Sequence, residues 1–425
     1  MLSISSTFPA RFSGKSALQL LQTASLDVGG SNQNGASVRS GVNAVSENGG
    51  AIDSIMRIIL DAKGNASVLI NSPDGIVSAT TGEGNDVIDI IAGRINYVST
   101  HGGDDAISIR AAGSGESDSI FNPAVYSVDA GDGNDSIDID SRGSVFSTNG
   151  GNGDDKITIV TTAPLRGRPD SIENLFEGIY STDGGNGDDT ISLESSTSVN
   201  STYGGNGNDT ISVVAAAYAM NTDGGNGDDI IRVASRDVFN VDGGKGNDAI
   251  HVASRLVSNV DGGSGDDVIE VAGLNIVNVT AGDGNDIISA SSAAALYNVS
   301  GGKGDDYVIL NGSSSVQSTY YFAEGDGHDT IETNNPLEIL PNGSDGTRRG
   351  DMMNAIIEKQ GNTLKIAFAN NTDTITINLT GRMAEAKNIR FTYNHNTQSL
   401  LIADDRFFVD NPSGQTVFLR PDATK

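Results

Sequence analysis

An aspartate at the end of a recurring glycine-rich phrase is the residue of this chain best suited to bind a metal ion. The phrase DGGNGDD occupies residues 183–189 and 223–229, and the variants DGGKGND and DGGSGDD occupy 242–248 and 261–267. Calcium takes about six to eight oxygen ligands, and stacked carboxylates without a cation would repel one another. We therefore predict that the last Asp of each phrase is a calcium ligand: Asp86, Asp105, Asp135, Asp155, Asp189, Asp209, Asp229, Asp248, Asp267, Asp286, Asp306 and Asp329.

Backbone carbonyls of glycines in the same phrases are predicted to complete the coordination shell, because glycine lets the backbone bend toward one centre. If successive turns stack at the ~4.8 Å spacing of strands in a sheet, an ion between two turns can contact both. The seven turns from Asp189 to Asp306 leave six gaps, so we expect several Ca²⁺ ions, roughly one between each pair of successive turns. The glycines are Gly185, Gly187, Gly205, Gly207, Gly225, Gly227, Gly244, Gly246, Gly263, Gly265, Gly282, Gly284, Gly302 and Gly304.

The spacing of these aspartates predicts the fold. Successive intervals are 19, 30, 20, 34, 20, 20, 19, 19, 19, 20 and 23 residues, a period of 19–20 broken by two insertions and a longer last step. A fixed period of this size is typical of solenoids. Apolar residues alternate after each turn, as at Ile231 and Val233, and a second short run precedes the next turn, as at 239–241. We expect an all-β parallel solenoid with two strands per coil.

The phrase resembles the nonapeptide G-G-x-G-x-D-x-U-x of RTX (repeats-in-toxin) proteins, which form a calcium-loaded parallel β-roll. The resemblance covers about residues 79–332. Members of that family place the turn every nine residues, whereas here it comes once per 19–20. The resemblance therefore implies a β-roll with calcium turns on one edge and ordinary turns on the other. Two turns depart from the motif, since His101 stands where a glycine belongs and His328 precedes the last Asp.

A second polar column precedes each turn and has two interpretations. Stacked Asn or Ser side chains can form a structural hydrogen-bonded ladder, or they can present a flat surface to glycans or ice. The Asp that opens a phrase, such as Asp183 or Asp242, is either an anchor behind the ligands or a turn starter. The column consists of Ser127, Ser147, Ser181, Ser201, Asn221, Asn240, Asn259, Asn278 and Asn298.

Three regions are expected: an N-terminal cap at 1–78, the calcium-binding roll at 79–332 and a C-terminal β domain at 333–425. Ile52, Ile55, Met56, Ile59 and Leu60 have helical spacing and predict a small helical cap that ends near Gly64. An amphipathic helix is also expected at 17–22, in place of a secretion leader. The insertion at 161–180 is interpreted as a surface loop that contacts a partner.

The C-terminal region resembles the haemolysin-type calcium-binding related domain, which implies a β cap. Strands are predicted at 364–368, 374–379, 389–392 and 399–402. In proteins of this kind the tail carries the type I secretion signal. The last residues, 420–425, do not have the apolar end that would be diagnostic of it.

Composition narrows the classes of function. The chain has 55 acidic and 26 basic residues, a formal charge of −29, which argues against nucleic acid as a partner and favours metal cations. It has no cysteine, so disulfides and thiolate ligands are excluded. Its four histidines form no H-E-x-x-H motif, and we do not expect an enzyme. No apolar run approaches the ~18 residues of a membrane span.

Together these features predict a secreted bacterial calcium-binding protein whose roll folds outside the cell as it binds Ca²⁺. Type I secretion is implied by the resemblance. The alternative is a structural or adhesive cell-surface protein, such as an S-layer, matrix or filament subunit, that assembles through calcium. Its partners would then be further copies of itself or cell-surface polysaccharide.

Overall fold

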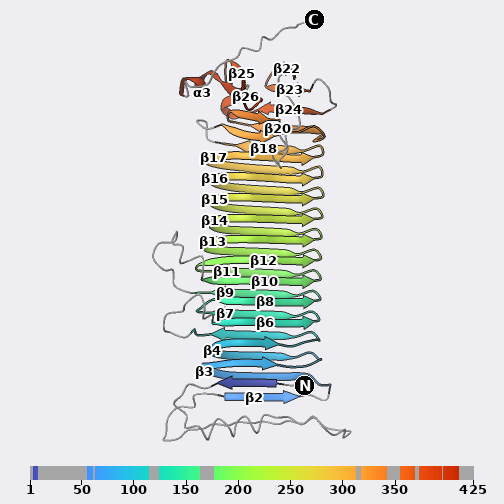
Figure 1. The fold of residues 1–425 in the computed structure, drawn as a ribbon, viewed down its shortest axis with the longest axis vertical. Helices are drawn as coiled ribbons and strands as arrows, with labels where there is room; N and C mark the ends of the chain where they lie inside the picture. The colour runs from blue at the N-terminus through green and yellow to red at the C-terminus, as the bar shows by residue number, and fades with distance from the viewer. Residues whose placement is uncertain are drawn as a thin grey trace. The chain divides into compact units, whose positions relative to one another are not determined.

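The computed structural model describes residues 3–7, 55–60, 63–113, 124–162, 177–312, 317–341, 355–368, 373–394 and 396–410. These residues form an all-β parallel solenoid of about 12 turns, which confirms the expected fold class (Figure 1). The helices among them are two short ones, α2 (Gly381–Ala384) and α3 (Asp405–Asp410). The chain divides into two compact units, residues 1–225 and 226–425, and each is described by itself.

Unit 1 begins with two antiparallel strands on the first long strand of the roll. Both β1 (Ser3–Thr7) and β2 (Ile55–Leu60) pair with β3 (Ala66–Thr80). The helix predicted over residues 52–60 is therefore wrong, since 55–60 form strand β2. The sequence IMRIIL is rich in β-branched residues, and pairing with β3 overrides its helical spacing. The helix predicted at 17–22 lies outside the described residues. Of the loop predicted at 161–180, residues 163–176 also lie outside them, whereas Thr161 and residues 178–180 belong to strands, so the loop is shorter than expected.

The coils of unit 1 are built from two series of parallel strands. Strands that follow a turn pair with one another, and strands that precede a turn do the same, so that Ile157 pairs with Ile191 and Ile191 with Ile211. These isoleucines are fully buried. The strands are β4 (Val87–Ser99), β5 (Ala106–Ala111), β6 (Val125–Asp132), β7 (Ser136–Ser141), β8 (Val145–Asn152), β9 (Lys156–Thr161), β10 (Gly178–Asn186), β11 (Thr190–Ser195), β12 (Ser198–Asn206) and β13 (Thr210–Asn226).

Unit 2, taken by itself, begins with four strands of 16–17 residues and goes on with shorter ones. Ile231, Ile250, Ile269 and Ile288 stack in register and are fully buried, and Val233 is 2% exposed. The alternation predicted after each turn is therefore confirmed. The strands are β14 (Ile230–Lys245), β15 (Ala249–Ser264), β16 (Val268–Asp283), β17 (Ile287–Lys303), β18 (Tyr307–Asn311), β19 (Ser318–Tyr321), β20 (His328–Thr333) and β21 (Leu337–Leu340).

The last part of unit 2 covers the end of the roll with antiparallel strands. Strand β24 (Thr374–Leu379) pairs in parallel with β20, and β23 (Thr363–Ala367) joins it to β22 (Ile356–Gln360). Strands β25 (Ile389–Asn394) and β26 (Ser399–Asp404) form a hairpin that pairs with β21. The four strands predicted in this region are present.

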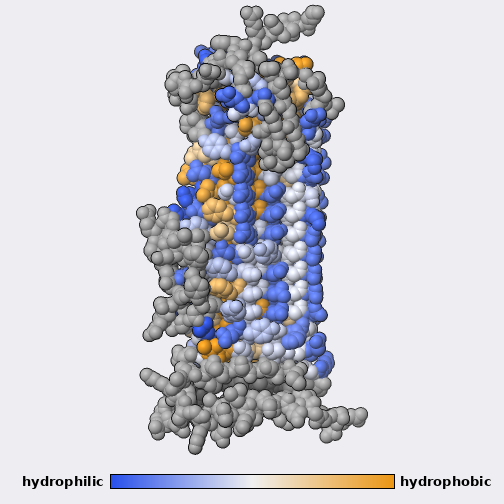
Figure 2. Space-filling view, in the orientation of Figure 1, coloured by the Kyte–Doolittle hydropathy of each residue, from blue (hydrophilic) through white to orange (hydrophobic). Residues whose placement is uncertain are grey.

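Each unit has a narrow aliphatic core and polar columns on its surface. Tyr320 and Phe322 are the largest fully buried side chains, and isoleucines follow them. In Figure 2 hydrophilic residues form columns from coil to coil at the edge where the turns lie. Among the described residues, no helix is long and apolar enough to cross a membrane.

Candidate metal-binding turns

The twelve predicted aspartates, called the ladder aspartates below, occupy the same place in every coil. Each side chain is only 1% to 3% exposed. The backbone N–H of a ladder Asp donates to Oδ1 of the next one, at 2.7 Å from Asp155 to Asp189 and from Asp248 to Asp267. This ladder links Asp86 to Asp209 in unit 1 and Asp229 to Asp329 in unit 2. One oxygen of each carboxylate is thus used to hold the coils in register.

The second carboxylate oxygen, Oδ2, lacks a hydrogen-bond donor in most of these turns. An unpartnered buried oxygen of a charged group costs about 1–3 kcal/mol or more, so its recurrence indicates a missing partner. Among the described residues, Oδ2 is buried without a hydrogen-bond partner in Asp86, Asp105, Asp135, Asp155, Asp189, Asp248, Asp267, Asp286 and Asp306.

A backbone carbonyl of the next coil lies near this oxygen, on the side of the first glycine where a side chain would stand. At Gly184, the first glycine of its phrase, a side-chain carbon would come closer than 3.0 Å to both Asp189 Oδ2 and the carbonyl oxygen of Gly204. We call this space, bounded by the first glycine, its ladder Asp and the facing carbonyl, the cradle. The same convergence occurs at Gly150, Gly204, Gly243 and Gly262. Two oxygens that face one another with no donor between them are suited to a cation.

The glycines predicted as ligands have a conformational role that the structure makes explicit. All fourteen have φ between +106° and +154°, a region that side chains disfavour. A Cβ on Gly263 would also overlap the carbonyl oxygen of Gly244 in the preceding coil. Whether their carbonyls bind calcium stays a prediction. The carbonyls that face the cradles belong to the residue five positions before the next ladder Asp, which is the first glycine of most phrases and Ala281 in one, and these carbonyls were not among the predicted ligands.

Burial makes the ladder carboxylates reluctant to carry charge. The pKa of Asp155, Asp189 and Asp267 is raised to about 7, mainly by burial and in part by neighbouring carboxylates, against the lowering effect of the backbone N–H bond. The pKa of Asp209, Asp248 and Asp286 is raised to about 6, again mainly by burial. A bound cation would reverse this effect by favouring the ionised form.

The residue behind the ladder, seven positions before the ladder Asp, differs along the chain. The first coils of unit 1 have buried valines at 98 and 128, and its later coils have buried threonines at 148, 182 and 202, which stack in register. Their Oγ1 atoms have no hydrogen-bond partner among the described residues. Unit 2 has buried valines at the same place: Val241, Val260, Val279 and Val299.

The end turns are irregular, as the sequence indicated. His101 has φ +74° in place of a glycine. His328 is exposed, and its Nδ1 lies 3.0 Å from Oγ1 of Thr374. Asp329 keeps its place in the ladder, but its Oδ2 accepts a hydrogen bond of 2.6 Å from the hydroxyl of Tyr320.

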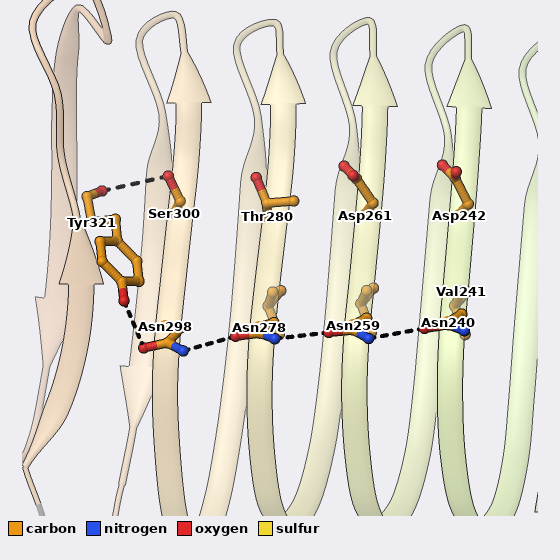
Figure 3. A pocket seen from close by; sticks show the side chains of 12 residues that line it. Asn240, Val241, Asp242, Asn259, Asp261, Asn278, Thr280, Asn298, Ser300 and Tyr321 are labelled. Carbon is orange, nitrogen blue, oxygen red and sulfur yellow. Dashed lines mark hydrogen bonds between the residues drawn. The ribbon is translucent and has the colours of Figure 1, made fainter. Parts of the chain in front are cut away.

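The second polar column forms a hydrogen-bonded ladder in unit 2 (Figure 3). Nδ2 of Asn259, Asn278 and Asn298 each donates to Oδ1 of the preceding Asn at 2.8–2.9 Å, and the Tyr321 hydroxyl donates to Asn298. These asparagines have φ between +56° and +61°, a conformation that Asn tolerates well. They form one wall of a groove of about 440 Å³, with Asp242 and Asp261 on the other. The structural interpretation of this column is therefore supported.

Neither the protein-family models nor the curated proteins contain a match to this chain. The resemblance to the RTX repeat thus rests on the turn motif and on the solenoid fold. Among the described residues, no group of three or more acidic or histidine side chains converges on one point. A cation at these turns would depend on one carboxylate per coil and on backbone oxygens.

Proposed function

We propose that this chain is a calcium-binding repeat protein whose β-roll is stabilised by ions in the cradles. The observation that supports this most is the repeated pairing of a buried, unpartnered Asp Oδ2 with a facing carbonyl oxygen. Calcium accepts irregular shells of carboxylate and carbonyl oxygens, whereas Mg²⁺ demands near-ideal octahedral geometry. The turns offer oxygen ligands without thiolate or imidazole, which disfavours zinc.

Charge couples ion binding to folding in this proposal. Residues 201–310 contain 14 Asp and one Glu against five Lys and Arg. The turns bring these carboxylates together, so the ion-free roll must overcome repulsion and desolvation. Because an ordered site exists only in the folded chain, the free energy of ion binding adds to the free energy of folding.

The affinity expected for such turns indicates where in or outside the cell the protein would fold. Extracellular calcium modules bind at about 10⁻⁴–10⁻³ M. A chain of this kind would stay expanded inside a bacterial cell and fold once secreted, for which type I export is the proposed route. The role we propose is binding and structure, without catalysis.

Circular dichroism with and without calcium tests the proposal. We expect the β-sheet signal of the full chain to be only partial in chelator, where part of the population is folded, and to rise cooperatively as Ca²⁺ reaches millimolar concentration. Magnesium at the same ionic strength is the control and should produce little of the increase in β-sheet signal. A sheet signal that is equally strong in chelator and in calcium would refute the proposal.

A structural or adhesive surface protein is the second candidate, and the regular polar columns of Figure 2 favour it, because they repeat one surface pattern from coil to coil. Light scattering of the folded chain in calcium distinguishes the two. Growth of large particles with rising Ca²⁺ supports assembly, whereas a constant monomer mass contradicts it.

A further inference from the structure

We propose that side chains of the chain itself take the place of the cation at end turns: the Tyr320 hydroxyl satisfies Asp329, and Thr100 fills the cradle of Asp105, so that neither Asp binds calcium. The inference rests on the proposed calcium binding and refines it. It divides the ladder aspartates into turns open to an ion and turns closed by a side chain.

Tyr320 satisfies the Oδ2 oxygen that is unpartnered elsewhere. The ring is fully buried, and its hydroxyl donates to Asp329 Oδ2 at 2.6 Å while it accepts the backbone N–H of Gly301 at 3.2 Å. Tyr320 pairs in register with Val299, so it occupies the place that valine holds behind the interior turns of unit 2. Its longer side chain reaches the ladder Asp from there, and Asp329 has its partner without an ion.

Thr100 closes a turn near the other end of the array by filling the cradle. It stands five residues before Asp105, as Gly184 stands before Asp189. Its side chain is fully buried, and its hydroxyl donates to the carbonyl oxygen of Ala130 at 2.7 Å. That carbonyl corresponds to the Gly204 carbonyl that faces the open cradle at Gly184.

Thr81 repeats the arrangement one coil earlier. It stands five residues before Asp86, is 1% exposed, and its hydroxyl donates to the carbonyl oxygen of Thr100 at 3.5 Å. Within the described part of the chain, Oδ2 of Asp86 and of Asp105 still has no hydrogen-bond donor, so the threonines close these turns by occupying the space and by satisfying the facing carbonyl. An ion between coils needs oxygens from two neighbouring turns, whereas a hydroxyl donor can satisfy an acceptor without adding charge. Closing the end turns in this way lets the ends of the roll order before the interior cradles fill.

Calcium stoichiometry of the full chain tests the proposal, measured by equilibrium dialysis or by native mass spectrometry. Thr100→Gly opens one cradle, and Tyr320→Val copies the interior turns of unit 2, so each should bind one calcium more than the wild type. Thr100→Ser keeps the hydroxyl and is the matched control, with no change in the count. Gly184→Thr performs the reverse change and should bind one calcium fewer.

The outcomes separate the two proposals. If the wild-type chain binds several ions and both Thr100→Gly and Tyr320→Val keep the same count, the closure by hydroxyl groups is overturned and calcium binding stands. A wild-type chain that binds no calcium overturns both. If Thr100→Gly fails to fold, Tyr320→Val and Gly184→Thr still decide the matter, because they change other coils.

Discussion

The coils at residues 145–209 and those at 241–306 carry the same ladder in front of different interiors. In the first region a buried threonine lies behind the turn, and in the second a buried valine. The N–H to Oδ1 bonds of the ladder nevertheless stay at 2.7–2.9 Å in both. A polar hydroxyl and a methyl group are thus interchangeable there, while the ladder Asp is present in every coil. Packing of the interior therefore does not explain why every turn has a ladder Asp. The second oxygen of that carboxylate needs a partner outside the core.

The largest expected effect comes from glycines on which both regions depend equally. Gly185 has φ +112° and Gly263 has φ +106°, and a Cβ on either would overlap a carbonyl oxygen of the preceding coil. We expect Gly185→Ala and Gly263→Ala each to lower the free energy of unfolding by roughly 3 kcal/mol or more, in calcium and in chelator alike. Urea denaturation measures this.

Gly325 provides the matched control for that prediction. Its φ is +96°, but a Cβ there would meet nothing within 4 Å. Gly325→Ala therefore adds only backbone strain, which costs about 1–2 kcal/mol. If Gly263→Ala is no worse than Gly325→Ala, close stacking of the coils is not what requires glycine.

Removing the charge of a ladder Asp should have opposite effects with and without calcium. Asn at position 189 or 267 retains Oδ1 for the ladder but loses the buried charge. We expect Asp189→Asn and Asp267→Asn to raise the free energy of unfolding in chelator and to lower it in calcium, by about 1–3 kcal/mol in each direction, and the melting temperature measures both changes. The change in the free energy of unfolding should be the same at Asp189, which has a threonine behind it, and at Asp267, which has a valine behind it.

Asp188 and Asp266 are the controls for the charge removal. Both are exposed neighbours of a ladder Asp, and their Oδ1 atoms accept backbone N–H bonds of 2.7 and 2.8 Å that Asn would keep. Asp188→Asn and Asp266→Asn should change the calcium midpoint little, the midpoint being the Ca²⁺ concentration at which half of the binding transition is complete. Equal midpoints for all four variants would show that the ladder position holds no ion.

Acid should replace calcium in part, in both regions. Burial raises the pKa of Asp189 and Asp267 from 3.8 to about 7. Between these values the unfolded chain releases protons that the folded chain retains, so the stability of the ion-free roll falls as pH rises from about 4 to about 7. We expect the chelated protein to melt at a higher temperature at pH 5 than at pH 8.

In calcium we expect the opposite, a higher melting temperature at pH 8 than at pH 5, since the ion stabilises the ionised carboxylates and competes with protons for them. Scanning calorimetry at the two pH values, with chelator and then with millimolar calcium, measures both trends. A chelated protein that is more stable at pH 8 than at pH 5 would contradict the raised pKa values.

The sequence was sufficient for the features that depend on period and alternation. The interval of 19–20 residues and the apolar pattern at Ile231 and Val233 predicted the coils, and the cap strands at 364–368 and 374–379 followed from the same reasoning. The helix over 52–60 failed because helical spacing and strand propensity coexist in that segment, and pairing with β3 decided between them.

What the sequence did not provide are features created by stacking. The carbonyl of Gly204 faces Asp189 only because one coil lies on the next, and Tyr320 reaches Asp329 only because its strand pairs in register with β17. The asparagine column gave a usable signal, since a residue type that tolerates positive φ recurs there, but the conformation itself needed coordinates.

Exchanging the interior residues is the smallest and most discriminating change. Thr182→Val removes a buried hydroxyl that has no hydrogen-bond partner among the described residues, so it should stabilise the ion-free roll by up to about 1 kcal/mol, whereas Val260→Thr buries a new hydroxyl and should destabilise it by about 1–3 kcal/mol. Neither should change the calcium midpoint more than about threefold, which is ~0.65 kcal/mol, if the ladder Asp and the carbonyls supply the ligands. Isothermal titration of both variants checks this. A tenfold loss of affinity in Thr182→Val, matched by a gain in Val260→Thr, would instead make the threonine hydroxyl a ligand and divide the array into two kinds of calcium site.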